Sequence, residues 1–183
     1  TAIVRAAEEM RSPVILAGVP KVTNALGMKV VSAAARAMAA QASVPVYLHL
    51  DHSTDVNICR DACDEGFSTV MIDGSRESLE TNIHMVREVV EYAHPRDIYV
   101  EGEIGKIKGN TEESQYTNGD FLVQVKDAVK LVEETGVDIL AVGIGTAHGF
   151  YKGKPEINFQ RLAEVNEALQ LPLVLHGGTG IPE

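Results

Sequence analysis

Three apolar runs in this sequence each end in a histidine that is followed by glycine or serine. They close on residues 50–53 (LDHS), 145–149 (GTAHG) and 175–180 (LHGGTG). Short apolar runs bounded by turn residues are typical of strands that are buried on both faces of a parallel sheet. The carboxyl ends of such strands lie at one edge, where α/β folds place their chemistry. We therefore expect His52, His148 and His176 to meet at that edge.

Strand patterns and helical patterns alternate along the whole chain. Strands are expected to start near residues 14, 45, 69, 98, 139 and 171. Apolar residues recur at helical spacing over residues 1–11, 25–41, 56–65, 79–94, 121–135 and 159–169. Ser53 or Thr54 is expected to cap the third of these helices, because a hydroxyl side chain can accept from the first free N–H groups.

This alternation fits either a doubly wound sheet or a (β/α)8 barrel, which typically has about 250 residues. Polar groups follow at least five of the strands, whereas a doubly wound sheet concentrates its site at one switch point. We therefore expect an α/β fold, a single domain over residues 1–183 that is a (β/α)8 TIM barrel with about six βα units. Residue 1 lies inside a helical pattern and residue 183 just after a strand, so we expect the barrel to be incomplete at both ends.

The charge and the two cysteines exclude several classes of protein. There are 16 basic and 26 acidic residues, a net charge of -10, and no basic block, so we expect neither a nucleic-acid nor a membrane partner. No apolar run approaches the roughly 20 residues that span a bilayer, and no signal peptide is visible. Cys59 and Cys63 offer no disulfide framework, which favours a cytoplasmic protein with reduced thiols.

Polar side chains gather where the expected strands end. They are Asp51, His52, Asp73, Glu101, Glu103, His148 and His176. A single strand-end histidine is usually structural, but three at equivalent strand ends match a catalytic zinc site with an open fourth position. The other three histidines lack this placement and are interpreted as structural: His49, His84 and His94.

Two glycine-containing segments could act beside such a metal. Residues 177–180 (GGTG) expose backbone N–H groups after a strand, an arrangement that can bind phosphate without a positive side chain. Residues 106–119 are polar and lack any periodicity, which indicates a surface loop, and loops of this length are usually functional or mobile.

Five motifs, in order and over essentially the whole chain, resemble those of the class II, metal-dependent ketose-bisphosphate aldolases. They are HLDH at 49–52, VMIDGS at 70–75, VEGEIG at 100–105, GTAHG at 145–149 and LHGGTG at 175–180. The resemblance implies a zinc-dependent (β/α)8 barrel that forms a homodimer or homotetramer. It also implies that the first strand, the last strand and the C-terminal helices are missing from this chain.

The resemblance implies a role for each matching residue. His52, His148 and His176 would be the catalytic zinc ligands, and Asp51 the acid/base. Asp73 and Glu103 would belong to a second metal position. The dihydroxyacetone-phosphate and monovalent-cation site would include Gly149, Gly177, Gly178 and Thr179, and the loop acid would be Glu112 or its neighbour Glu113.

The activity that the resemblance implies is cleavage of fructose 1,6-bisphosphate, or of its C4 epimer tagatose 1,6-bisphosphate, into dihydroxyacetone phosphate and glyceraldehyde 3-phosphate. Zinc would stabilise the enediolate as a Lewis acid, so no lysine Schiff base is needed, and Asp51 would move the C4 hydroxyl proton. Two alternatives stay open: a zinc-dependent barrel hydrolase, and a noncatalytic aldolase-like fragment or subunit.

Overall fold

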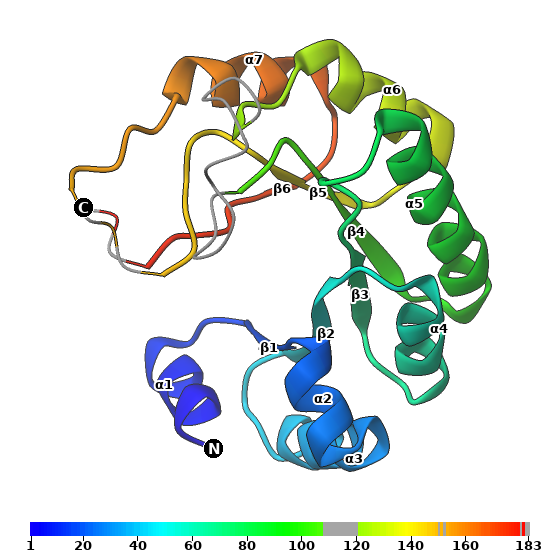
Figure 1. The fold of residues 1–183 in the computed structure, drawn as a ribbon. Coiled ribbons are helices and arrows are strands. Elements are labelled where there is room, and N and C mark those ends of the chain that lie inside the picture. The colour runs from blue at the N-terminus through cyan, green and yellow to red at the C-terminus, as the bar shows by residue number, and fades with distance from the viewer. Residues whose placement is uncertain (108–120, 150, 152, 180, 182–183) are drawn as a thin grey trace. The chain divides into compact units, whose positions relative to one another are not determined.

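The computed structural model describes residues 1–107, 121–149, 151, 153–179 and 181. They fall into two compact units (Figure 1). The first unit contains Thr1–Ile72 and Glu88–Val100, and the second contains Asp73–Arg87 and Glu101–Glu183. The boundary between the units passes through one helix and one strand.

The first unit has three parallel strands that neighbour one another in chain order. Its elements up to residue 72 are α1 (Ala2–Met10), β1 (Val14–Gly18), α2 (Pro20–Leu26), α3 (Met28–Ala39), β2 (Val46–Ser53), α4 (Val56–Asp64) and β3 (Thr69–Ile72). Val14 pairs with Val46, and His49 with Thr69. Helices α3 and α4 pack on β2, and α4 also packs on β3, whose residues are all buried (Figure 1).

The helix expected over residues 25–41 is shorter, and a separate helix that was not expected precedes it. Helix α2 ends at Leu26 and α3 begins at Met28. Gly27 separates them with φ of 85°, a conformation that a residue with a Cβ rarely adopts. The prediction was therefore wrong at its start, because residues 25 and 26 belong to α2.

Strand β2 continues beyond its apolar run to Ser53 and contains a bulge. Leu50 pairs with Val70 and Ser53 with Ile72, so three steps along β2 match two steps along β3. His52 has φ of 50°, which is the left-handed region. An inserted residue of this kind bends a strand and changes the direction of its side chains.

The start of α4 differs from the expectation. The N-cap is Asp55, whose carboxylate accepts from the backbone N–H of Asn57 at 2.8 Å. Ser53 is still part of β2, and its hydroxyl donates to the backbone oxygen of Asp55 at 3.0 Å. The prediction of a Ser53 or Thr54 cap was therefore wrong by one or two residues, because Asp caps a helix as well as Ser or Thr does.

The second unit has three parallel strands in chain order as well. The remaining elements of the chain are α5 (Leu79–Ala93), η1 (His94–Arg96), β4 (Tyr99–Ile104), α6 (Val125–Thr135), β5 (Ile139–Val142), α7 (Phe159–Ala168) and β6 (Leu173–Val174), of which η1 and the ends of α5 and β4 belong to the first unit. Gly102 pairs with Leu140, and Leu140 with Leu173. Helix α6 packs on α7 (Figure 1).

The helix expected over residues 121–135 is shorter than predicted. Helix α6 begins at Val125, and its N-cap Gln124 is extended. Leu122 forms an isolated antiparallel bridge with Ile144, and the Val123 N–H donates to the Gly143 oxygen at 2.8 Å. Residues 122 and 123 therefore pair with the backbone that follows β5 and do not join the helix.

The strands begin within about two residues of the predicted positions, and the α/β class is confirmed. The pairings described above between neighbouring strands of each unit are parallel, and β3 is apolar apart from Thr69 and buried along its whole length, as expected for a strand covered on both faces. Among the described residues, no helix is both long enough and apolar enough to cross a lipid bilayer.

Candidate metal centre and its surroundings

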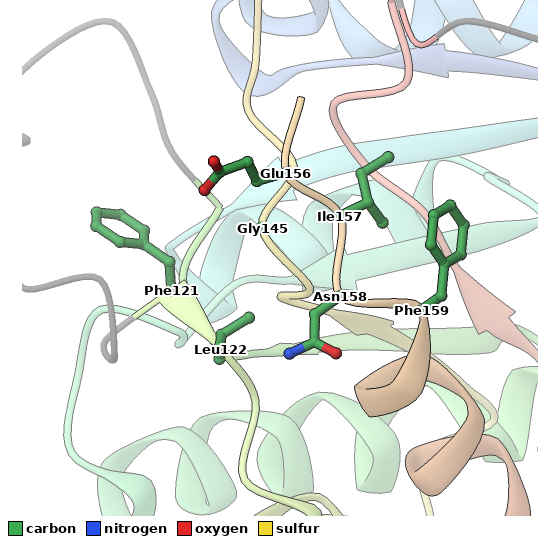
Figure 2. A pocket seen from close by; sticks show the side chains of 7 residues that line it. All are labelled: Phe121, Leu122, Gly145, Glu156, Ile157, Asn158 and Phe159. Carbon is green, nitrogen blue, oxygen red and sulfur yellow. The ribbon is translucent and has the colours of Figure 1, made fainter. Parts of the chain in front are cut away.

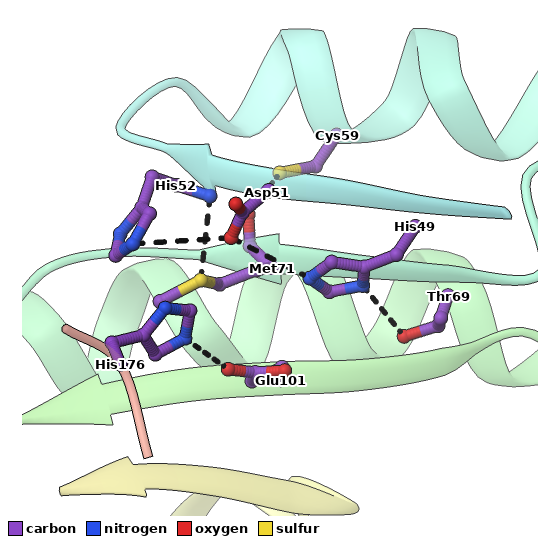
Figure 3. A network of polar contacts seen from close by, with 8 residues as sticks. All are labelled: His49, Asp51, His52, Cys59, Thr69, Met71, Glu101 and His176. Carbon is purple, nitrogen blue, oxygen red and sulfur yellow. Dashed lines mark hydrogen bonds and ion pairs between the residues drawn. The ribbon is translucent and has the colours of Figure 1, made fainter. Parts of the chain in front are cut away.

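Asp51 and His52 lie at the bulge of β2 in the first unit. The Asp51 Oδ1 lies 3.9 Å from the Nε2 of His52 and 3.9 Å from the Nε2 of His49 (Figure 3). In a regular strand neighbouring side chains point to opposite faces. The inserted residue and the positive φ of His52 remove that restriction, so the carboxylate and the His52 imidazole come close to each other.

The backbone of this bulge is tied to the neighbouring strand. The His52 N–H donates to the Sδ of Met71 at 3.3 Å, and the side chain of Met71 is fully buried. His49, which is 6% exposed, has its Nδ1 3.3 Å from the Thr69 hydroxyl. These contacts with β3 hold the strand end from which Asp51 projects.

In the second unit, His148 and His176 face each other across two turns. Their ring centroids are 6.1 Å apart with an interplanar angle of 79°, and each offers a ring nitrogen within 4.8 Å of the other's. His176 follows β6, and its Nε2 lies 2.9 Å from the Oε1 of Glu101 on β4 (Figure 3). Glu101 is 5% exposed, so this carboxylate is buried, whereas His176 is half-buried.

This arrangement fits a metal ion such as zinc. Histidines that bind metals usually donate one ring N–H to a carboxylate or carbonyl, which orients the other nitrogen toward the ion. The Glu101 to His176 contact has this form, and His148 supplies a second imidazole at chelating distance. Imidazole is a donor that suits borderline divalent ions.

Asp73 and Glu103 are also brought together within the second unit. Each offers a carboxylate oxygen within 4.8 Å of the other's. Asp73 accepts from the N–H of Ser75 at 3.0 Å and from its hydroxyl at 2.6 Å. The Glu103 backbone oxygen accepts from the Nδ2 of Asn82 at 2.8 Å. Paired carboxylates at this distance are a donor set for a hard cation.

The glycines expected to bind phosphate lie on turns next to the histidines. Gly149 and Gly177 have φ of 86° and 73°. A Cβ on Gly177 would lie 2.6 Å from the Ala147 oxygen, so the turns after β5 and β6 touch through their backbones. Gly178 and Thr179 are exposed. Glu112 and Glu113, the candidates for the loop acid, lie outside the described residues.

A separate cleft of about 420 Å³ opens in the second unit (Figure 2). It is lined by Phe121, Leu122, Gly145, Glu156, Ile157, Asn158 and Phe159. None of these is an expected ligand or acid/base. The cleft therefore adds space beside the turn that leads to His148 but contains none of the expected metal ligands.

Sequence reasoning missed three contributors to this site. Glu101 was noted at a strand end, but its contact with His176 depends on strand register. Asn82 falls on the buried face of α5, and a buried amide among apolar residues was a signal that could have been used. Tyr151 donates to the backbone oxygen of Gly177 and accepts from the N–H of Ala147, and nothing in the sequence pattern indicates this.

Comparison with known proteins places the chain among aldolases. A family model described as class-II fructose-bisphosphate aldolase matches residues 1–183. The chain is 44% identical over 184 residues to the 6-phospho-5-dehydro-2-deoxy-D-gluconate aldolase of Bacillus licheniformis, covering 99% of this chain and 62% of that protein. It is 40% identical over 185 residues to the protein of the same name from Halalkalibacterium halodurans, covering 100% of this chain and 64% of that protein.

A crystal structure of the YdjI aldolase from Escherichia coli K12 matches with a TM-score of 0.84 and 35% identity, covering 98% of this chain and 63% of that chain. The match confirms the expected fold class, α/β with part of a (β/α)8 barrel. The chain spans a little under two thirds of the length of each of these relatives.

Proposed function

We propose, starting from the fact that this chain belongs to the class II fructose-bisphosphate aldolase family, that it carries out metal-dependent aldol cleavage and condensation of a phosphorylated sugar. Two observations together carry the proposal: His176 contacts the carboxylate of Glu101, and His148 lies at chelating distance from His176. Such a pair of contacts is typical of metal-binding histidines and is not a general feature of strand ends.

We assign the zinc ligands as His52, His148 and His176. The assignment rests on the family's motifs, on the chelating distance between His148 and His176, and on the position of each histidine at or after the end of a parallel strand. Asp73 and Glu103 are proposed for a second metal position. When bound, zinc supplies Lewis-acid polarisation of the substrate ketone and so stabilises the negative charge that develops there.

The protein's own groups perform the proton transfer and the substrate binding. Asp51 takes the proton from the hydroxyl that lies β to the ketone as the carbon–carbon bond breaks, and returns it in condensation. The bulge of β2 directs its carboxylate away from the normal alternation of the strand. Gly149, Gly177, Gly178 and Thr179 are proposed to bind the substrate phosphate through N–H and hydroxyl groups.

The substrate proposed first is 6-phospho-5-dehydro-2-deoxy-D-gluconate, because both of the curated relatives described above are named for it. A retro-aldol reaction on its C5 ketone breaks the C3–C4 bond and gives dihydroxyacetone phosphate and 3-oxopropanoate. Fructose and tagatose 1,6-bisphosphate give the same dihydroxyacetone phosphate half with a phosphorylated aldehyde. They are the second candidates, favoured by the description of the family model.

The test measures release of dihydroxyacetone phosphate from each of the three substrates. Cleavage should require zinc or cobalt, stop after exhaustive chelation and resume when the metal is returned. His176→Ala should lose bound metal as well as rate, whereas His84→Ala, on the exposed face of α5, should lose neither. Inactivation by borohydride in the presence of substrate would instead indicate a lysine imine and would contradict the proposal.

The other outcomes distinguish the alternatives. Release of phosphate or of another hydrolysis product without dihydroxyacetone phosphate would favour a zinc hydrolase. Metal binding without turnover of any of these substrates would favour a noncatalytic fragment or subunit. The monovalent cation, the homodimer or homotetramer and the cytoplasmic location stay predictions.

A further inference from the structure

The hydroxyl of Tyr151 joins the two turns that carry His148 and His176. It accepts from the N–H of Ala147 at 3.0 Å and donates to the backbone oxygen of Gly177 at 2.8 Å. Each of these backbone groups belongs to the residue next to one of the two histidines. A phenol oxygen can accept and donate at once, so one side chain satisfies one group from each turn.

The same two turns are in direct backbone contact. Gly177 has φ of 73°, and a Cβ there would lie 2.6 Å from the oxygen and 2.8 Å from the carbonyl carbon of Ala147. No side chain separates the turns at this point. Their relative position is therefore set by backbone packing together with the two hydrogen bonds of the Tyr151 hydroxyl.

We propose that Tyr151 is a positioning residue that fixes the spacing of His148 and His176 and thereby raises the affinity of the protein for its metal. This proposal rests on the proposed function, because it assumes that the two histidines bind the ion. Without the hydroxyl, the Ala147 N–H and the Gly177 oxygen lose their partner, and the turns gain freedom that metal binding must then remove.

The variant Tyr151→Phe removes only the hydroxyl oxygen and keeps the ring. Groups that orient metal ligands typically change metal affinity by about 10–100-fold when removed, so we expect zinc affinity to fall by about 10-fold or more. The probe is zinc alone, titrated in competition with a coloured chelator. The matched control is Tyr99→Phe, which removes the same hydroxyl from a side chain that is 62% exposed on β4.

A second measurement uses the unmodified protein and does not depend on how the variant folds. If the hydroxyl bridge promotes zinc binding, linkage requires that zinc binding stabilises the bridge by the same factor. Hydrogen exchange at the Ala147 amide should therefore slow when zinc is added.

A third measurement compares the unmodified protein with Tyr151→Phe. The absorption spectrum of bound cobalt should differ between them, because the ligand geometry changes.

The outcomes separate this proposal from the proposed function. Zinc affinity in Tyr151→Phe within about twofold of the unmodified protein, or an equal loss in Tyr99→Phe, would overturn the positioning role and leave the metal site standing. An Ala147 amide whose exchange is unaffected by bound zinc would overturn it as well. A protein that binds no zinc at all would overturn both.

Discussion

Asp51 is the residue whose role depends most on local geometry. It lies beside an inserted residue in β2, and its Oδ1 is equally far, at 3.9 Å, from the imidazoles of His49 and His52. At this distance each imidazole, when protonated, forms an ion pair with the carboxylate. We therefore expect the Asp51 carboxylate to act beside two imidazoles, and a general base must in addition reach a substrate hydroxyl.

Replacing Asp51 by alanine should separate metal binding from proton transfer. Asp51→Ala is expected to keep bound zinc and lose about 10²–10⁴-fold in kcat, because a general acid/base typically contributes that much. Exchange of the dihydroxyacetone-phosphate proton should suffer less, since that step does not involve the hydroxyl. Zinc content and both rates are the measurements.

The isosteric variant Asp51→Asn is the control, because it keeps the shape of the side chain and removes its basicity. It should lose cleavage as Asp51→Ala does. Loss of zinc in either variant, or equal loss of cleavage and exchange, would mean that Asp51 is a ligand or a structural residue.

At the scale of single residues, the sequence could predict which side chains carry chemistry but not how they are held. The histidines and carboxylates stand out because they follow apolar runs. The φ of 50° at His52 and the contact from His176 to Glu101 depend on a bulge and on strand register. Neither feature can be recognised from the local pattern of polar and apolar residues.

Two glycines bring the backbones of β4 and β5 together where the strands end. Gly105 has φ of 74°, and a Cβ there would lie 2.8 Å from the Val123 nitrogen. A Cβ on Gly143 would lie 2.7 Å from the carbonyl carbon of Gly105. The extended segment before α6 fits against these strand ends only because both positions lack a side chain.

Gly105→Ala should therefore destabilise the protein more than a glycine substitution in open space. The matched control is Gly136→Ala at the end of α6, where φ is 69° and no atom lies within 4 Å of the added Cβ. The control isolates the cost of the left-handed backbone, roughly 1–2 kcal/mol. Steric overlap should add about 1–3 kcal/mol at Gly105. Urea unfolding of both variants measures the difference, and equal losses would contradict the close approach.

At the scale of elements, apolar periodicity predicted the strands well and the helix ends less well. Strands β1, β3 and β5 begin where the apolar runs begin. In β3 and β5 the reason is burial on both faces, which requires continuous apolar residues. The errors lie at Gly27, at the Asp55 cap and before Val125. There the outcome depends on a glycine conformation, on equivalent capping residues and on backbone pairing with β5.

At the scale of the whole molecule, the order of βα units and of the motifs was enough to predict the family and the fold class. The βα units and the motifs are spread over the whole chain, so errors at the ends of individual elements change neither the predicted family nor the predicted fold class. The substrate was harder to predict. Fructose 1,6-bisphosphate and 6-phospho-5-dehydro-2-deoxy-D-gluconate share the dihydroxyacetone phosphate half, so the residues proposed to bind that half do not distinguish the two substrates.

The two cysteine thiols are buried in the folded protein. Burial raises the pKa of Cys59 to about 12 and that of Cys63 to about 11, against 9.0 for an ordinary thiol. Cys59 is fully buried, and its Sγ lies 3.4 Å from the backbone oxygen of Met71. The folded protein thus keeps the thiols protonated at a pH where the unfolded chain ionises them.

The free energy of unfolding should consequently fall at alkaline pH, and part of this fall can be assigned to Cys59. Its folded pKa is raised, so its stabilising contribution is complete below pH 9 and is lost as the pH rises from 9.0 toward about 12. Between about pH 8 and 10 this thiol alone should lower the free energy of unfolding by about 1 kcal/mol. Cys59→Ser cannot ionise there, so its free energy of unfolding, measured with urea at each pH, should decline less steeply than that of the unmodified protein. The difference between the two pH slopes removes the contributions of lysine and tyrosine, and identical slopes would show that the Cys59 thiol already ionises normally in the folded protein.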